Sequence, residues 1–146
     1  MSPASRLTRV LVGVVLGAAC AGEGTGLDEF GNPLDGGQTT LQPTFSSIQQ
    51  RIFTPICTQC HAGAAAPLGF SLEAAVSYGN LVHVPSVQLP SMVRIEPGAP
   101  SSSYLLLKLE GASGIVGGRM PLGLPALSSG ELRAVRDWIA AGALRN

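Results

Sequence analysis

The stretch Cys57-Thr58-Gln59-Cys60-His61 decides how the rest of this chain is read. Its pattern, C-x-x-C-H, is the attachment signature of a c-type haem. Two thiols at this spacing can each form a thioether bond to one haem vinyl group. The histidine that follows the second cysteine can then ligate the iron from the proximal side. The motif therefore predicts one covalent haem c, anchored by Cys57 and Cys60, with His61 as the proximal iron ligand.

The same five residues are also compatible with zinc binding, with thiol redox chemistry and with chance. A structural zinc site normally takes four Cys or His ligands. Beyond the first 20 residues the chain offers only Cys57, Cys60, His61 and His83, so zinc would consume them all. A thioredoxin-type redox pair would lie near a βαβ pattern, which the sequence lacks. A C-x-x-C pair can also stand beside a histidine by chance. The sequence favours haem attachment over all three.

The first 20 residues have the features of an export signal. Arg6 and Arg9 precede an apolar run over residues 10–19, which is too short to span a bilayer and fits a secretory signal. Residues 19–21 fit the small-x-small rule of an ordinary signal peptidase. Residues 16–20 instead resemble a bacterial lipobox, which would make Cys20 a lipidated first residue. We therefore expect residues 1–20 to be a signal peptide and the mature protein to lie in the periplasm or cell envelope. We favour lipidation of Cys20 over ordinary cleavage, because an unmodified Cys20 would be an idle reactive thiol in an exported protein.

Residues 21–43 are expected to form a flexible tether, because they hold six glycines and four acidic residues and show no hydrophobic periodicity. Residues 44–146 then form one domain. The formal net charge of the whole chain is zero, which gives no reason to expect nucleic acid as a partner. The membrane would be contacted only through a lipid on Cys20.

The domain is predicted to be all-α, since no stretch alternates apolar and polar residues with a period of two. Proline-rich residues 83–100 and glycine-rich residues 111–127 predict long loops. We expect about four helices around one haem. The first helix is capped by Thr44 and ends before Pro55, and the second is capped by Ser71 and covers 72–82. The third begins after Ser101 or Ser102, covers 104–110 and stops at Gly111. The last runs from the capping box Ser128-x-x-Glu131 to Gly142.

Over about residues 44–144 the chain resembles the class I cytochromes c, the small single-haem family. Phe53 lies four residues before Cys57, where that family often has an aromatic residue on its first helix. Trp138 occupies the last helix, which in the family crosses the first. Residues 97–111 (PGAPSSSYLLLKLEG) and 118–123 (GRMPLG) look more specifically like haem domains of exported bacterial proteins and lipoproteins. The resemblance implies the class I cytochrome c fold.

The resemblance also implies iron ligands. Met120 follows Gly118 and Arg119 on a loop like the one that carries the family's distal methionine. A soft thioether suits iron in an electron carrier. Met92 and His83 are the other candidates for the sixth position, and His83 would give bis-histidine ligation.

Further residues are candidates for contact with the haem. A guanidinium group suits bidentate contacts with a carboxylate, so Arg119 is a candidate partner for a haem propionate, with a solvated loop arginine as the alternative. Phe53 and Trp138 are expected to be core aromatics that also pack near the haem. In the family a proline carbonyl holds the proximal histidine, and the nearest proline here, Pro67, follows His61 by six residues.

Electron transfer is the function that these expectations favour. The sequence shows no evident catalytic acid, base or nucleophile, so we expect an electron carrier and not an enzyme. The alternative is a haem-based enzyme accessory domain or small-ligand sensor, which needs an exchangeable sixth ligand. A cell-surface module that only carries the fold is a third class. We expect a monomer whose redox partner the sequence does not identify. From residue 44 on there are seven basic and five acidic residues and one lysine, Lys108, so electrostatic steering of a partner should be weak.

Overall fold

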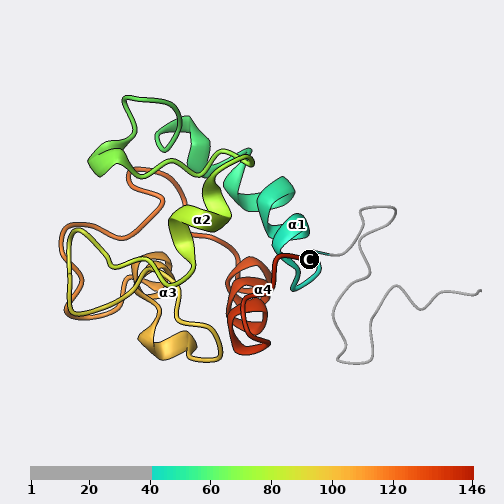
Figure 1. Ribbon diagram of the computed structural model, residues 1–146. Coiled ribbons are helices and arrows are strands. Elements are labelled where there is room, and N and C mark those ends of the chain that lie inside the picture. Colours follow the sequence, from blue (N-terminus) through green and yellow to red (C-terminus); the bar gives the residue numbers. More distant parts are fainter. Residues whose placement is uncertain (1–40) are drawn as a thin grey trace, which may run out of the picture. The chain divides into compact units, whose positions relative to one another are not determined.

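Four α-helices, joined by long loops and short 3₁₀ or π-helical turns, form the regular structure of residues 41–146, the part of the chain that the computed structural model describes (Figure 1). The helices are α1 (Phe45–Ile48), α2 (Ser77–Leu81), α3 (Tyr104–Glu110) and α4 (Ser129–Ala140). Within this part there is no β-strand, only three isolated β-bridges. Helix content does not by itself assign a fold family, so the class I cytochrome c fold stays a prediction.

The expected signal peptide, Cys20 and residues 21–40 of the expected tether lie outside the described residues. No helix in the described part is long and apolar enough to cross a membrane.

The first helix begins as predicted and then changes type. Thr44 caps α1, and its Oγ1 accepts a hydrogen bond from the N–H of Ser47 at 3.3 Å. The chain continues from α1 into a π-helical segment, Gln49–Phe53, instead of a regular α-helix. π-helical segments of this kind are rare and often lie at functional sites. Here the segment leads directly toward the C-x-x-C-H motif.

The second helix is shorter than predicted. α2 begins at Ser77, and of the residues expected to form its first turns only 74–76 form a turn. The N–H of Leu72 donates to the carbonyl of His61 at 2.7 Å, and the carboxylate of Glu73 accepts from the N–H of Gly63 at 2.8 Å. The expected cap Ser71 donates its hydroxyl to Glu73 at 2.9 Å. The prediction was wrong because contacts with the segment after the haem motif compete with the first helical turn.

The two later helices follow their local signals. α3 covers the predicted residues, but its N-cap is Ser103, preceded by a 3₁₀ turn over Pro100–Ser102. Gly111 ends α3 in the left-handed region with φ 68°. Ser128 and Glu131 form the predicted capping box at the start of α4. The stop at Gly111 and the capping box need only residues within one turn, and both were predicted correctly. The expected opening of the third helix at Ser101 or Ser102 was wrong, because these residues belong to the 3₁₀ turn.

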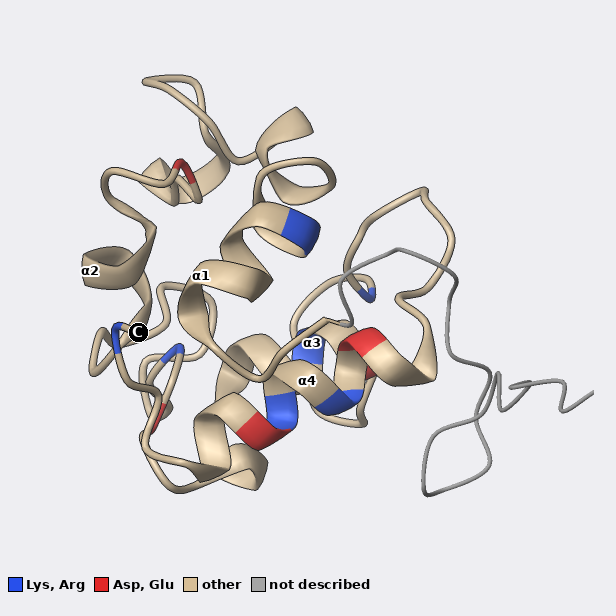
Figure 2. Ribbon diagram, turned by 90° about the vertical axis from the view of Figure 1, so that its right-hand side faces the viewer, with Lys and Arg blue, Asp and Glu red and all other residues tan. Residues whose placement is uncertain are grey.

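One apolar core joins the helices. The ring centroids of Phe45 on α1 and Trp138 on α4 lie 5.8 Å apart, and Tyr78 on α2 meets Phe45 edge-on at 5.0 Å. An ion pair between Arg136 and Glu110 links α4 to α3 on the surface. Charged positions are sparse along the described ribbon, and several of them lie together on α3 and α4 (Figure 2). The core cluster comprises Phe45, Ile48, Ile52, Phe53, Leu72, Leu81, Ile95, Leu106, Leu109, Leu127, Val135, Trp138, Ile139 and Ala143.

Candidate haem site

The C-x-x-C-H motif forms one tight turn. A 3₁₀ helix covers Cys57–Gln59. The N–H of His61 donates to the carbonyl of Cys57 at 2.8 Å, and the N–H of Cys60 donates to the same oxygen at 3.2 Å. This i, i+4 hydrogen bond brings the side chains of Cys57 and His61 to one face of the turn. Both cysteines are free thiols and not a disulfide.

A backbone carbonyl fixes the imidazole of His61. Its Nδ1 lies 3.0 Å from the carbonyl oxygen of Phe70. A carbonyl only accepts, so Nδ1 carries the proton, and Nε2 of the neutral ring keeps a lone pair for a metal. Histidines that ligate metals are generally oriented by such a hydrogen bond. The carbonyl that holds His61 therefore belongs to Phe70 and not to Pro67.

A cavity of about 350 Å³ gathers the predicted ligands. This volume is within the range of ligand pockets. Both cysteines of the motif, His61 and Met120 line it, and none of its lining residues is Asp or Glu. Its apolar wall is formed by Ile56, Pro67, Leu68, Phe70, Leu72, Val87, Leu105, Leu109, Pro121, Leu122 and Leu124.

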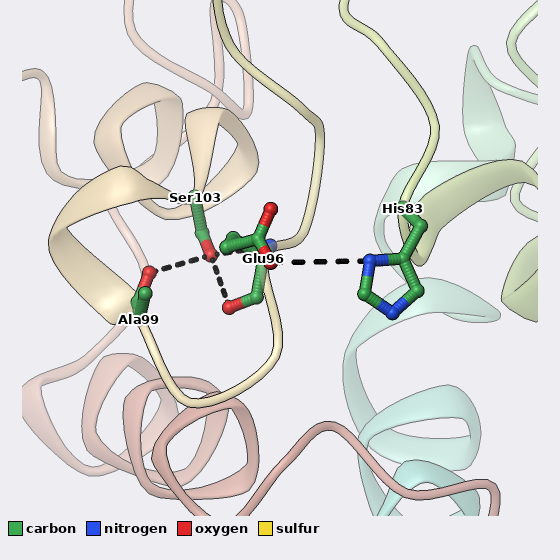
Figure 3. A network of polar contacts seen from close by, with 4 residues as sticks. All are labelled: His83, Glu96, Ala99 and Ser103. Atoms are coloured by element: carbon green, nitrogen blue, oxygen red, sulfur yellow. Dashed lines mark hydrogen bonds and ion pairs between the residues drawn. The ribbon is translucent and has the colours of Figure 1, made fainter.

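Of the three candidates for the sixth iron ligand, only Met120 lines this cavity. Met92 is half-buried, and its backbone closes a turn with Ser86 and Leu89. The side chain of His83 is 67% exposed. Its Nδ1 points toward a carboxylate oxygen of Glu96 at 3.9 Å, beside the hydroxyl of Ser103 (Figure 3). His83 and Met92 are therefore not grouped with the motif.

The remaining expected haem contacts lie elsewhere. The guanidinium of Arg119 donates to the carbonyls of Met120 at 3.2 Å and Leu124 at 3.3 Å, and Arg119 is not among the cavity-lining residues. Phe53 and Trp138 are buried in the core cluster and also do not line the cavity. Arg119 thus contacts backbone carbonyls near its own position, and Phe53 and Trp138 pack in the core.

Two cationic residues that the sequence reasoning did not assign to the site do line the cavity. The guanidinium carbon of Arg94 lies 4.4 Å over the ring centroid of Phe70. Lys108 lines the cavity from α3, between the apolar neighbours Leu105 and Leu109. Burial lowers the pKa of both cations. The sequence did hold a signal for Lys108, because it is a charged residue that follows Leu105 by three positions on an apolar helix face. Arg94 lies in a loop, where no such pattern marks it.

The alternative uses of the cysteines fit this geometry less well. Burial raises the pKa of the Cys57 thiol to about 12, whereas redox dithiols have a lowered thiol pKa. In the described part of the chain, no three Cys, His, Asp or Glu side chains group as a metal site. Zinc binding would need His83, which lies on the surface.

No protein-family model, curated protein or solved structure matches the chain. The function proposed below therefore rests on the motif and on the geometry of the cavity.

Proposed function

We propose that residues 44–146 form a class I-like cytochrome c domain that transfers electrons through one covalently attached haem. One observation carries the proposal. The cavity is lined by the two cysteines and the histidine of C-x-x-C-H, and also by Met120, which lies 59 residues further along the chain. A zinc site or a redox dithiol gives no reason for a methionine at this place.

Each part of a haem has a counterpart in the cavity. The apolar wall suits the ring system, and the thiols suit its two vinyl groups. An imidazole with a free Nε2 and a soft thioether suit the iron. Arg94 would offset part of the charge of the two propionates, and the cavity has no carboxylate that would repel them.

A haem bound here would supply the redox chemistry, by cycling between ferric and ferrous iron. The residues of the chain position it. The Phe70 carbonyl orients the imidazole of His61, Met120 supplies a thioether that favours the ferrous state, and the apolar wall limits the access of water. We propose an electron carrier that is exported to the periplasm or cell envelope, is anchored there if Cys20 is lipidated, and acts as a monomer on a partner protein.

The test is a reduced-minus-oxidised difference spectrum of the full chain expressed in a bacterium that attaches haem c, together with haem staining of a denaturing gel. We expect a low-spin c-type spectrum and a stained band. The matched control is Cys57→Ser with Cys60→Ser, which should lose the stain. A colourless wild-type protein would overturn the proposal. Rapid binding of carbon monoxide to the reduced wild type would favour the enzyme or sensor alternative.

A further inference from the structure

Lys108 contacts the loop that carries Met120 with both its side chain and its backbone. Its Nζ donates hydrogen bonds to the carbonyl oxygens of Val116 and Gly118, each at 2.7 Å. Its own carbonyl oxygen accepts the N–H of Met120 at 2.8 Å. Lys108 thus donates two hydrogen bonds to residues 116–120 and accepts one from them, and we name this segment the Met120 loop.

The burial of Lys108 depends on this loop. The residue is only 5% exposed, and no ion pair within residues 41–146 involves its ammonium group. A buried charge is costly unless hydrogen bonds replace its hydration. The side-chain hydrogen bonds found for Lys108 both go to carbonyls of the Met120 loop. If the loop moved away, the ammonium group would lose these acceptors, so lysine and loop stabilise each other.

The loop needs an external support because it has no regular structure of its own. Residues 116–118 are exposed, and Gly117 has φ 72°. A second support comes from Tyr104, whose hydroxyl oxygen accepts the N–H of Val116 at 2.9 Å. Tyr104 and Lys108 are one helical turn apart on α3, and both line the cavity. The same face of α3 therefore forms part of the cavity wall and holds the loop.

The carbonyl of Lys108 can accept a hydrogen bond from the Met120 loop because α3 ends close to this residue. The last four carbonyls of an α-helix have no partner within the helix. In α3 the carbonyl of Leu107 accepts from Gly111 and Ala112, whereas that of Lys108 is left for Met120. The carbonyl of Lys108 thus binds the Met120 loop because the helix ends there, whereas its ammonium group binds the same loop because it is buried.

We infer that Lys108 is a positioning residue that holds the Met120 loop at the cavity, with Tyr104 as its second support. The role of the loop as carrier of an iron ligand rests on the proposed function, but the hold itself does not. Lys108 acts through Met120 and its neighbours and needs no direct contact with a bound group.

The test compares Lys108→Met in the full chain with Arg133→Met, which removes one cation from an exposed position on α4. Hydrogen exchange is followed by mass spectrometry of peptides. In Lys108→Met we expect exchange across residues 116–120 to be about tenfold faster, since hydrogen bonds to a charged group are lost, while peptides from α1 and α4 keep their wild-type rates. The weak red absorption band of ferric iron bound to a thioether should also be weakened. Arg133→Met should change neither.

Tyr104→Phe provides the second measurement, because it removes one acceptor and keeps Lys108. Exchange should then rise at Val116 but not at Met120. Wild-type exchange rates across the loop in Lys108→Met, or in the milder Lys108→Gln if Lys108→Met fails to fold, would overturn the inference for Lys108. Wild-type exchange at Val116 in Tyr104→Phe would remove the second support. With haem present, this result leaves the electron-transfer proposal standing. A wild-type protein without haem would refute that proposal, and the exchange rates would still decide whether Lys108 holds the loop.

Discussion

The Nδ1 atom of His61 lies 3.0 Å from the carbonyl oxygen of Phe70, nine residues further along the chain. The Phe70 ring also meets the imidazole edge-on, with centroids 5.2 Å apart. The N–H of Leu72 donates a hydrogen bond to the carbonyl of His61 at 2.7 Å. The histidine is therefore held at its ring and at its backbone by one segment, which determines the nitrogen that is free to bind a metal.

This relationship predicts a specific proton signal. In the reduced, diamagnetic protein the Nδ1–H of His61 should give a slowly exchanging resonance with nuclear Overhauser contacts to Phe70. The signal should disappear in denaturant, which serves as the control. Contacts to Pro67 in place of Phe70 would contradict the hydrogen bond.

Met120 is predicted to be the sixth iron ligand. Met120→Ala should remove the weak red band of the ferric spectrum, lower the reduction potential, and open the reduced iron to carbon monoxide. We also expect a loss of about 2–4 kcal/mol in the free energy of unfolding, because a packed side chain and an iron bond both disappear.

Met92→Ala is the matched control, since Met92 is half-buried outside the cavity. It should leave the band, the potential and the carbon monoxide reactivity unchanged. A ferric band that survives in Met120→Ala, or is lost in Met92→Ala, would assign the ligand elsewhere.

Sequence patterns predicted best the features that depend on neighbouring residues. Thr44, Gly111 and Ser128 mark helix ends because a cap acts within one turn. The start of α2 was misplaced because Leu72 is bound to His61, a partner that local patterns do not contain.

The candidate site shows the same division. Cys57, Cys60 and His61 were readable from their spacing, and Met120 from the resemblance of its loop to that of a known family. The Phe70 carbonyl was not readable, since a backbone acceptor has no side-chain signature. Lys108 could have been identified, because it is a charged residue on the apolar face of a short helix.

Gln49 is predicted to stabilise the fold through a buried polar network. Its side-chain amide donates to the Leu72 carbonyl at 2.9 Å and accepts the hydroxyl of Ser77 at 2.6 Å. Gln49→Ala leaves both groups buried without these partners, so the free energy of unfolding should fall by about 2–4 kcal/mol. Gln50→Ala, one residue further on and exposed, should cost less than about 0.5 kcal/mol. Denaturant titration of both variants measures the difference, and equal losses would count against the network.

The anchor prediction concerns Cys20, which lies outside the described residues. If Cys20 is lipidated, Cys20→Ala should move the protein from the membrane fraction to the soluble periplasmic fraction. Immunoblots of the two fractions measure this. A wild-type protein that is already soluble would show that the leader is an ordinary signal peptide.

Glu73 is predicted to make the segment after the haem motif sensitive to acid. Hydrogen bonds from the N–H of Gly63, and then from the hydroxyl of Ser71, hold the pKa of the Glu73 carboxyl below its ordinary value of 4.5. Because the folded pKa is depressed, the carboxylate contributes stability above pH 4.5 and loses that contribution as the pH falls through the folded pKa. Glu73→Gln keeps the size of the side chain and removes the charge. The variant should therefore be less stable than the wild type at pH ~7, and the difference should shrink as the pH is lowered toward ~3. Denaturant midpoints of the two proteins across this range measure the effect. A difference between them that stays constant with pH would show that the charge of Glu73 plays no part.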